Sequence, residues 1–350
     1  MNLQYQVNAM AKPSRFNDLT RNITRDALEH PKDLTKFFSE KEKITRAAAA
    51  RYVLQLEREG WIARSGPATR PIFSPGYLRR VSQIYELNNL EEDVIWTQDF
   101  KPYFNLKPNV TNIAAHGFTE MVNNSIDHSS GTSVFITASQ TEKSLTLVVA
   151  DNGIGIFEKI SAALNLADKR QALFELAKGK LTTDPSKHSG EGVFFTSRMF
   201  DYYEIEANGL QFSHDEKHDF LMEEPSPFVK GTVVFMKVAL DSERTTSDVF
   251  NQFMNAPEDF DFSKTIVPMK LARLGDEQLI SRSQAKRLIA RFDRFKKVIL
   301  DFKSVNEIGQ AFADELFRVY ANEHPQVELT PVNMSEQIEK MWLRAVAPRT

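Results

Sequence analysis

The stretch EMVNNSIDH, at residues 120–128, carries the clearest functional signal in this chain. On a helix, Glu120 and Asn124 are four residues apart and therefore project side by side from one face, and Asp127 falls on nearly the same face. Apolar residues between them supply packing around the rest of the helix. Polar side chains aligned in this way are expected to face a ligand rather than bulk water.

Three glycine-containing turns and a strand follow this helix. Residues 144–150 form an apolar run that predicts a buried strand, and the run ends in the sequence DNGIG at residues 151–155. Glycines at such a turn allow a backbone to come close to a flat ligand. Further on, Gly190 and Gly192 precede a helical pattern at residues 193–199. Glycines that lead into a helix N-terminus present N–H groups to an anion such as a phosphate.

Each piece is weak alone, but their order and spacing are specific once the turn and strand at residues 230–236 are added. Together they resemble the four sequence boxes of the GHKL ATP-binding superfamily, which includes gyrase, the heat-shock chaperone, histidine kinases and anti-sigma-factor kinases. The resemblance covers residues 85–240 and implies ATP and Mg²⁺ as cofactors. The residues assigned to this pocket are Glu120, Asn124, Asp127, Asp151, Gly153, Gly155, Gly190, Gly192, Val193 and Thr232.

The resemblance also implies a role for several of these residues. Asn124 would bind Mg²⁺, and Glu120 would be the general base where ATP is hydrolysed. Asp151 would accept a hydrogen bond from the adenine amino group, with Thr232 close to the adenine. A glutamate at this position occurs in family members that hydrolyse ATP and in members that transfer phosphate, so hydrolysis, transfer and binding alone remain alternatives.

The segment from Phe157 to Ser189 would be a lid over the nucleotide, with a polar tip from Lys178 to His188. The seven histidines are scattered and show no metal-binding spacing. His128 is expected at the surface or in a local hydrogen bond, and His188 is a minor candidate for contact with the phosphates.

The first 80 residues show a different pattern. Helical periodicity is present at residues 14–29, around residues 34–38 and from Thr45, a predicted N-cap, to Gly60, a predicted C-cap. Two short strands are predicted at residues 61–63 and 72–73. This order, and above all the run LQLEREGWI at residues 54–62, resembles the winged helix-turn-helix family.

The charge of the chain is unevenly distributed. Residues 12–80 hold 15 Lys and Arg against 8 Asp and Glu, whereas the remainder holds 29 against 39, so the overall −3 hides a basic segment. The family resemblance implies that the third helix enters the major groove of DNA, with Arg46 and Arg51 on that helix and Arg64 and Arg70 in the wing as contacts. The alternative is a protein-docking module whose arginines form a solvated face.

Strand and helix patterns alternate from residue 264 to residue 345, which predicts an α/β layer. The strand at 298–302 and the segment that follows it resemble a STAS-like domain. In STAS antagonists of anti-sigma factors a phosphorylated serine begins the next helix, but this chain has Ile308-Gly309-Gln310-Ala311 there, without a hydroxyl. A docking or dimerising role is therefore expected.

Three acidic residues of this last region, Asp301, Asp314 and Glu315, are interpreted as loop and solvent-face charges. The expected fold class is an α+β and α/β multidomain protein. It would comprise a winged helix-turn-helix at 1–80, a GHKL α/β sandwich at 81–250 and a small STAS-like α/β domain at 258–350.

The composition narrows the function classes. The absence of cysteine excludes a disulfide framework, a thiolate metal site and a cysteine nucleophile. The chain has no apolar run of about 18 residues and no apolar stretch of a signal peptide at its N-terminus, so a cytoplasmic protein without a membrane span is expected. We expect a transcriptional regulator whose DNA or partner binding is switched by binding or slow hydrolysis of Mg-ATP. The alternative is a serine/threonine protein kinase of the anti-sigma-factor type that acts on a separate STAS partner.

Overall fold

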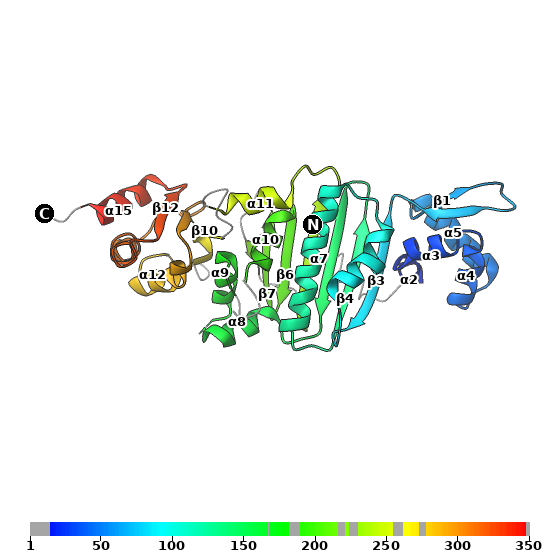
Figure 1. Ribbon diagram of the computed structural model, residues 1–350, viewed down its shortest axis with the longest axis horizontal. Coiled ribbons are helices and arrows are strands. Elements are labelled where there is room, and N and C mark those ends of the chain that lie inside the picture. Colours follow the sequence, from blue (N-terminus) through cyan, green and yellow to red (C-terminus); the bar gives the residue numbers. More distant parts are fainter. Residues whose placement is uncertain are drawn as a thin grey trace.

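The structure, a computed structural model, describes residues 15–166, 168–181, 190–215, 221–223, 230–254, 262–272 and 278–347. Three units lie in a row (Figure 1). We call residues 15–78 the head, residues 79–254 the central domain and residues 262–347 the tail. No helix within these described ranges is long and apolar enough to cross a membrane.

The head consists of helices followed by a hairpin, in the predicted order. Its elements are α2 (Arg15–Thr20), α3 (Ile23–Glu29), α4 (Leu34–Lys41), α5 (Arg46–Glu59), β1 (Ile62–Ser65) and β2 (Ile72–Pro75), and the two strands pair antiparallel. The predicted ends of α5 are confirmed. Thr45 Oγ1 accepts from the N–H of Ala48 at 3.2 Å, and Gly60 ends the helix with φ of +88°.

The helix predicted at residues 14–29 is divided in two at Arg21 and Asn22. At this break the side chain of Asn22 accepts a hydrogen bond at 2.9 Å from the N–H of Ser82. Thr24 Oγ1 accepts from the N–H of Arg80 in the same strand at 2.8 Å. The start of α3 is therefore tied to the edge of the central sheet rather than continuing the helix before it.

The central domain is a seven-stranded antiparallel sheet in the order β3-β4-β5-β9-β6-β7-β8. The strands are β3 (Arg79–Glu86), β4 (Ser133–Gln140), β5 (Ser144–Asp151), β6 (Tyr202–Ala207), β7 (Leu210–Asp215), β8 (Leu221–Glu223) and β9 (Thr232–Ala239). Strand β3 was not predicted, and it begins at Arg79, two residues before the boundary expected between the first two domains.

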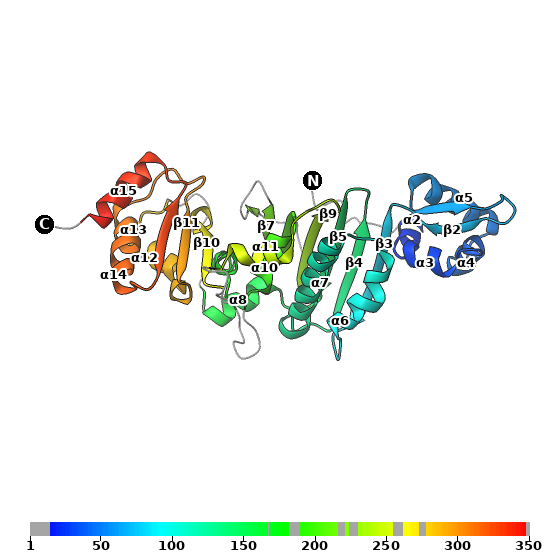
Figure 2. The same ribbon diagram turned by 45° about the horizontal axis from the view of Figure 1, so that its top comes forward.

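Helices cover one face of this sheet (Figure 2). The helices of the central domain are α6 (Glu92–Ile95), the π-helix η1 (Trp96–Phe100), the 3-10 helix η2 (Lys101–Tyr103), α7 (Pro108–His128), α8 (Ile156–Leu164), α9 (Arg170–Lys178), α10 (Gly192–Met199) and α11 (Thr246–Gln252). The alternation of β5 sets its orientation, since Leu145, Leu147 and Val149 are buried on the helix side. Helix α7 packs against α10 and against β5 and β9.

The tail contains the predicted alternation of strands and helices around a parallel sheet in the order β10-β11-β12. The strands are β10 (Lys264–Pro268), β11 (Lys297–Asp301) and β12 (Glu328–Val332). The helices are η3 (Met269–Ala272), α12 (Arg282–Ile289), η4 (Phe292–Arg294), α13 (Gln310–Asp314), η5 (Glu315–Tyr320), α14 (Ala321–Glu323) and α15 (Glu336–Val346).

The hydrophobic cores do not follow the three units one to one. The head has its own core, in which Phe38 and Leu56 are fully buried. The cores of the central domain and the tail are continuous with each other. Phe262 joins them, because its ring centroid lies 4.5 Å from that of Phe194 and 5.5 Å from that of Phe295.

The predicted lid is described only in part. Residues 156–164 and 170–178 are the helices α8 and α9, while residues 182–189, which include His188, lie outside the described residues. Lys178 was expected in a polar, solvated tip, and this is wrong because it is the last residue of α9 and is fully buried. The predicted start of the last domain, at residue 258, also lies outside the described residues.

Candidate functional site

A cavity of about 310 Å³ lies between α7, the sheet, and helices α8, α9 and α10. From α7 it is lined by Glu120, Asn124 and His128, which follow the spacing i, i+4, i+8. From the sheet and the other helices it is lined by residues of the predicted boxes, among them Asp151, Gly190, Gly192, Val193 and Thr232. The cavity therefore collects most of the polar residues that the sequence pattern singled out.

The two residues at the end of α7 are placed differently from the prediction. Asp127 is exposed and is not among the described residues that line the cavity. His128, which was expected at the surface, does line it. Helical spacing alone does not give this outcome, because at about 100° per residue Asp127 lies about 20° around the helix from Glu120 and His128 about 80° from it. The cavity therefore turns around α7 toward His128 in the last turn of the helix.

Asp151 ends β5 at the floor of the cavity and is 8% exposed. Its Oδ1 accepts from the N–H of Gly153 at 2.8 Å and from the N–H of Thr232 at 3.3 Å. Burial raises the pKa of Asp151 above its ordinary value, although these hydrogen bonds oppose the shift. Thr232 Oγ1 accepts from the N–H of Ile156 at 3.0 Å, so the strand end, the turn and the start of α8 are held together.

Gly153 and Gly155 were both assigned to the nucleotide pocket. Neither is among the described residues that line the cavity. A Cβ on Gly153 would lie 2.1 Å from the carbonyl oxygen of Ser129. Gly155 has φ of +87°, and a Cβ there would lie 2.3 Å from Oδ1 of Asn208. In this structure these glycines permit a close approach of the protein's own backbone and side chains.

The second pair of glycines lies at the opposite side of the cavity. A Cβ on Gly192 would lie 1.9 Å from Oε2 of Glu120, so the start of α10 packs closely against this carboxylate. Gly190 has φ of +73°, and its carbonyl oxygen accepts from the N–H of Leu181 at 3.0 Å. The pKa of Tyr203 is raised by burial and also by the negative charge of Glu120.

Lys159 is a cavity residue that the sequence reasoning missed. Among the described residues that line the cavity it is the only lysine or arginine. Its Nζ donates to the carbonyl oxygen of His128 at 2.7 Å, at the C-terminal end of α7. The available signal was its position, three residues into the helix that follows the DNGIG turn, where a cation can reach an anion bound at the turn.

The four arginines predicted to contact DNA are all exposed. Arg46 and Arg51 lie on α5, and Arg70 lies in the hairpin loop. Arg64 was assigned to the same surface. Its Nε lies 3.2 Å from Oε1 of Glu57, so it forms an ion pair with α5. Helix α3 packs against β3, whereas α4, α5 and the tip of the hairpin lie at the far end of the molecule (Figure 2).

The acidic residues of the tail are more buried than predicted. Asp301 and Glu315 are each 7% exposed, so the interpretation as solvent-face charges is wrong for these two. Asp301 Oδ1 accepts from the N–H of Lys303 at 3.0 Å and from Nδ2 of Asn333 at 2.8 Å, which fixes the turn after β11. The position without a hydroxyl, Gly309, is the N-cap of α13.

Comparison with known protein families agrees with this geometry. Residues 110–211 match the model of the histidine kinase-, DNA gyrase B- and HSP90-like ATPase family. Residues 284–339 match a STAS-like domain of unknown function. No curated protein matches the chain. The chain therefore contains a GHKL-type ATPase domain and a STAS-like domain, which are the central domain and the tail.

Proteins with this ATPase domain bind ATP, usually with Mg²⁺, and the cavity fits both. Its volume lies within the range of small-molecule sites. Asp151 offers a buried acceptor for an amino group, and Lys159 offers a cation for phosphates. The described residues hold no cluster of three His, Cys, Asp or Glu that would bind a metal ion by itself. That suits Mg²⁺, which usually keeps several waters and is shared with substrate phosphates.

Asn124 is the residue that would complete this shared Mg²⁺ site. It lines the cavity, and its amide nitrogen lies 4.0 Å from Sδ of Met121. The residues of the cavity therefore suit a complex of Mg²⁺ with a nucleotide rather than the metal ion alone.

Proposed function

We propose that this protein is an ATP-dependent regulator of transcription, in which Mg-ATP bound in the central domain controls how the basic head binds DNA. The observation that carries the proposal is the cavity in the central domain. There Glu120, Asn124, Asp151 and Thr232 meet beside the start of α10. The exposed arginines of α5 and the hairpin on the same chain support the DNA-binding half of the proposal.

In the proposed site each polar group has a separate task. Bound Mg-ATP supplies a triphosphate whose terminal phosphate can be transferred to water or to a hydroxyl. Asp151 accepts from the adenine, Asn124 holds Mg²⁺, and the N-terminus of α10 faces the phosphates. Glu120, which lies beside Gly192 at that N-terminus, would take a proton from a water near the phosphates. We expect slow hydrolysis, and a Glu120→Ala protein that turned over ATP as fast as the parent would exclude the general-base role.

The DNA-binding half is tested by fluorescence anisotropy with a labelled DNA duplex, at several salt concentrations, with and without Mg-ATP. Contacts between arginines and phosphates release counterions, so the affinity of the full chain should fall steeply as salt rises. A change in affinity on addition of Mg-ATP would establish the switch. Absence of salt-dependent binding would contradict the proposal and would favour a head that docks a protein.

The same preparation separates regulation from a kinase activity. Incubation with ATP labelled on its terminal phosphate should release labelled inorganic phosphate slowly and leave other proteins unlabelled. Transfer of label to serine or threonine of an added STAS protein would instead support the serine/threonine kinase. Gly309 leaves the tail of this chain without a hydroxyl at the position where STAS antagonists are phosphorylated.

A further inference from the structure

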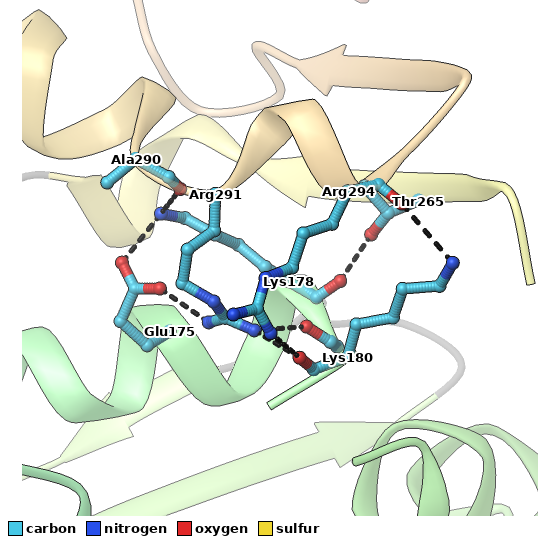
Figure 3. A network of polar contacts seen from close by, with 8 residues as sticks. Glu175, Lys178, Lys180, Thr265, Ala290, Arg291 and Arg294 are labelled. Atoms are coloured by element: carbon cyan, nitrogen blue, oxygen red, sulfur yellow. Dashed lines mark hydrogen bonds and ion pairs between the residues drawn. The ribbon is translucent and has the colours of Figure 1, made fainter. Parts of the chain in front are cut away.

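The C-terminal end of α9 is completed by the tail (Figure 3). The last carbonyl groups of a helix find no partner within the helix and need donors from elsewhere. Here the last carbonyl oxygen of α9, that of Lys178, and those of the next two residues, Gly179 and Lys180, accept from tail side chains. Thr265 Oγ1 donates to the first at 2.7 Å, Arg291 donates to the second at 3.1 Å and also to the third, and Arg294 donates to the third at 2.9 Å.

Buried charges reinforce this junction. Glu175 accepts from Nζ of Lys178 at 2.6 Å and from Nη1 of Arg291 at 2.7 Å, one on each carboxylate oxygen (Figure 3). Lys178 Nζ also donates to the carbonyl oxygen of Ala290 at 2.9 Å. Burial lowers the pKa of Lys178 to about 8, although the charge of Glu175 opposes the shift. Charges at this depth persist only when they are paired, so α9 and the tail depend on each other here.

The segment that the tail holds is also a wall of the nucleotide cavity. Leu176 and Leu181, which flank the three carbonyl groups, both line the cavity. The N–H of Leu181 donates to the carbonyl oxygen of Gly190, which lines it as well. One short segment therefore faces the tail on one side and the bound ligand on the other.

We propose that the tail is a clamp on the nucleotide site, with Arg291 as the positioning residue. Arg291 orders the end of α9 and so sets the position of the Leu176–Leu181 wall against which the nucleotide packs. The inference rests on the proposed binding of ATP and names how that binding is regulated. Because coupling between two binding events is reciprocal, bound ATP strengthens the docking of the tail by the same factor by which a docked tail strengthens ATP binding. A partner that displaces the tail would therefore release the nucleotide.

The test measures the affinity of the full chain for Mg-ATP by calorimetry, in the parent and in three variants. Arg291→Met removes the donors to α9 and should weaken Mg-ATP binding by about tenfold, a coupling of the usual size for linked sites. Arg291→Lys should restore part of the affinity. Arg287→Met is the matched control, because Arg287 is an exposed arginine on α12 of the same domain, and it should bind as the parent does.

Hydrogen exchange in the unmodified parent provides a second readout that a purely structural contact would not move. Addition of Mg-ATP should slow exchange at residues 290–294 of the tail as well as in the cavity. If Arg291→Met fails to fold, Thr265→Val, which removes a single hydrogen bond to α9, takes its place with a smaller loss of affinity.

The clamp would be overturned if a folded Arg291→Met protein bound Mg-ATP as tightly as the parent. It would also be overturned if hydrogen exchange at residues 290–294 were unchanged by Mg-ATP. Either result would leave the proposed nucleotide site intact. Failure of the parent itself to bind Mg-ATP would overturn both.

Discussion

The head and the tail are joined to the central domain by different kinds of interaction. The head has a separate hydrophobic core and is attached to β3 mainly through polar contacts. Arg25 of the head donates to the side chains of Gln83 at 3.1 Å and Tyr103 at 3.0 Å. The tail instead shares a continuous core with the central domain and adds the buried charges of Glu175 and Lys178.

The two junctions also differ in their distance from the cavity, because only one of the two units contacts a wall of it. The tail holds a wall of the cavity, whereas the head contacts β3, an edge strand that contributes no residue to the cavity among the described ones. A change in the cavity reaches the tail through one helix, but reaches the head only indirectly, through the sheet or through α7, η1 and η2, whose Asp99 and Tyr103 contact Arg25.

The largest loss of stability is expected when a side chain is removed from the core shared by the central domain and the tail. Phe262→Ala should lower the free energy of unfolding by about 3–5 kcal/mol, because a buried aromatic ring between two units leaves a cavity. In scanning calorimetry it should shift the transition of the central domain and tail together. Phe38→Ala, the control in the separate head core, should shift only the head. A tail that melted alone in Phe262→Ala, with the central domain unchanged, would show that the cores are independent.

Removal of one carboxylate from each interface compares the two directly. Glu175→Gln leaves two buried cations without their partner and should destabilise the protein by about 3 kcal/mol. Asp99→Asn acts on a half-exposed carboxylate 3.7 Å from Arg25 and should destabilise it by less than about 1 kcal/mol. Both are measured by urea unfolding at pH 7. Equal effects would mean that the buried network is no stronger than the surface one.

Acid should destabilise the central domain through two half-buried histidines, His116 and His214. Burial lowers the pKa of His116 to about 4 and that of His214 to about 3, whereas the unfolded chain titrates near 6.5. Between these values the unfolded chain binds protons that the folded protein does not, so stability falls as pH falls below 6.5. For His116 the loss should reach about 3 kcal/mol by pH 4. Urea unfolding at a series of pH values checks this, and His116→Leu should have a shallower acid slope.

A smaller effect is expected at the cavity itself. Lys159→Gln should weaken Mg-ATP binding about tenfold, equivalent to about 1.4 kcal/mol, and leave adenosine binding unchanged, because adenosine carries no phosphate. Lys169→Gln, at the exposed start of α9, is the control. Equal losses for ATP and adenosine would show that Lys159 supports the fold of the site rather than the phosphates.

The smallest change is expected in the head. Arg51→Ala should weaken DNA binding at every sequence and reduce the slope of log affinity against log salt by about 1. Arg21, at the break between α2 and α3 beside the central sheet, provides the matched control. Mg-ATP affinity should be unchanged in both variants, since the head is remote from the cavity. An unchanged salt slope in Arg51→Ala would remove this residue from the DNA contact.

The sequence predicted what depends on local signals. The ends of α5 follow from Thr45 and Gly60, and the floor of the cavity follows from an apolar strand that ends at Asp151. Strand β3 was missed because its alternation is obscured by polar residues. The burial of Lys178 could not be predicted, because its environment depends on Arg291, 113 residues away along the chain.

The surroundings of two assigned residues could not be predicted, for a similar reason. Asp127 was placed by helical spacing alone, but the cavity follows only the part of α7 that the sheet and α10 leave open. Arg64 was assigned from its charge, but its neighbour Glu57 became apparent only when α5 and the hairpin were packed together. Spacing predicts which residues share a face, and tertiary packing decides where that face is covered.

The most direct test of the central claim is a calorimetric titration of the full chain with ATP in the presence and absence of Mg²⁺. One Mg-ATP should bind per chain, and an Asn124→Ala protein should lose at least tenfold in affinity with Mg²⁺ but little without it. A parent that binds no ATP, or an Asn124→Ala protein with the same Mg²⁺-dependent affinity as the parent, would contradict it.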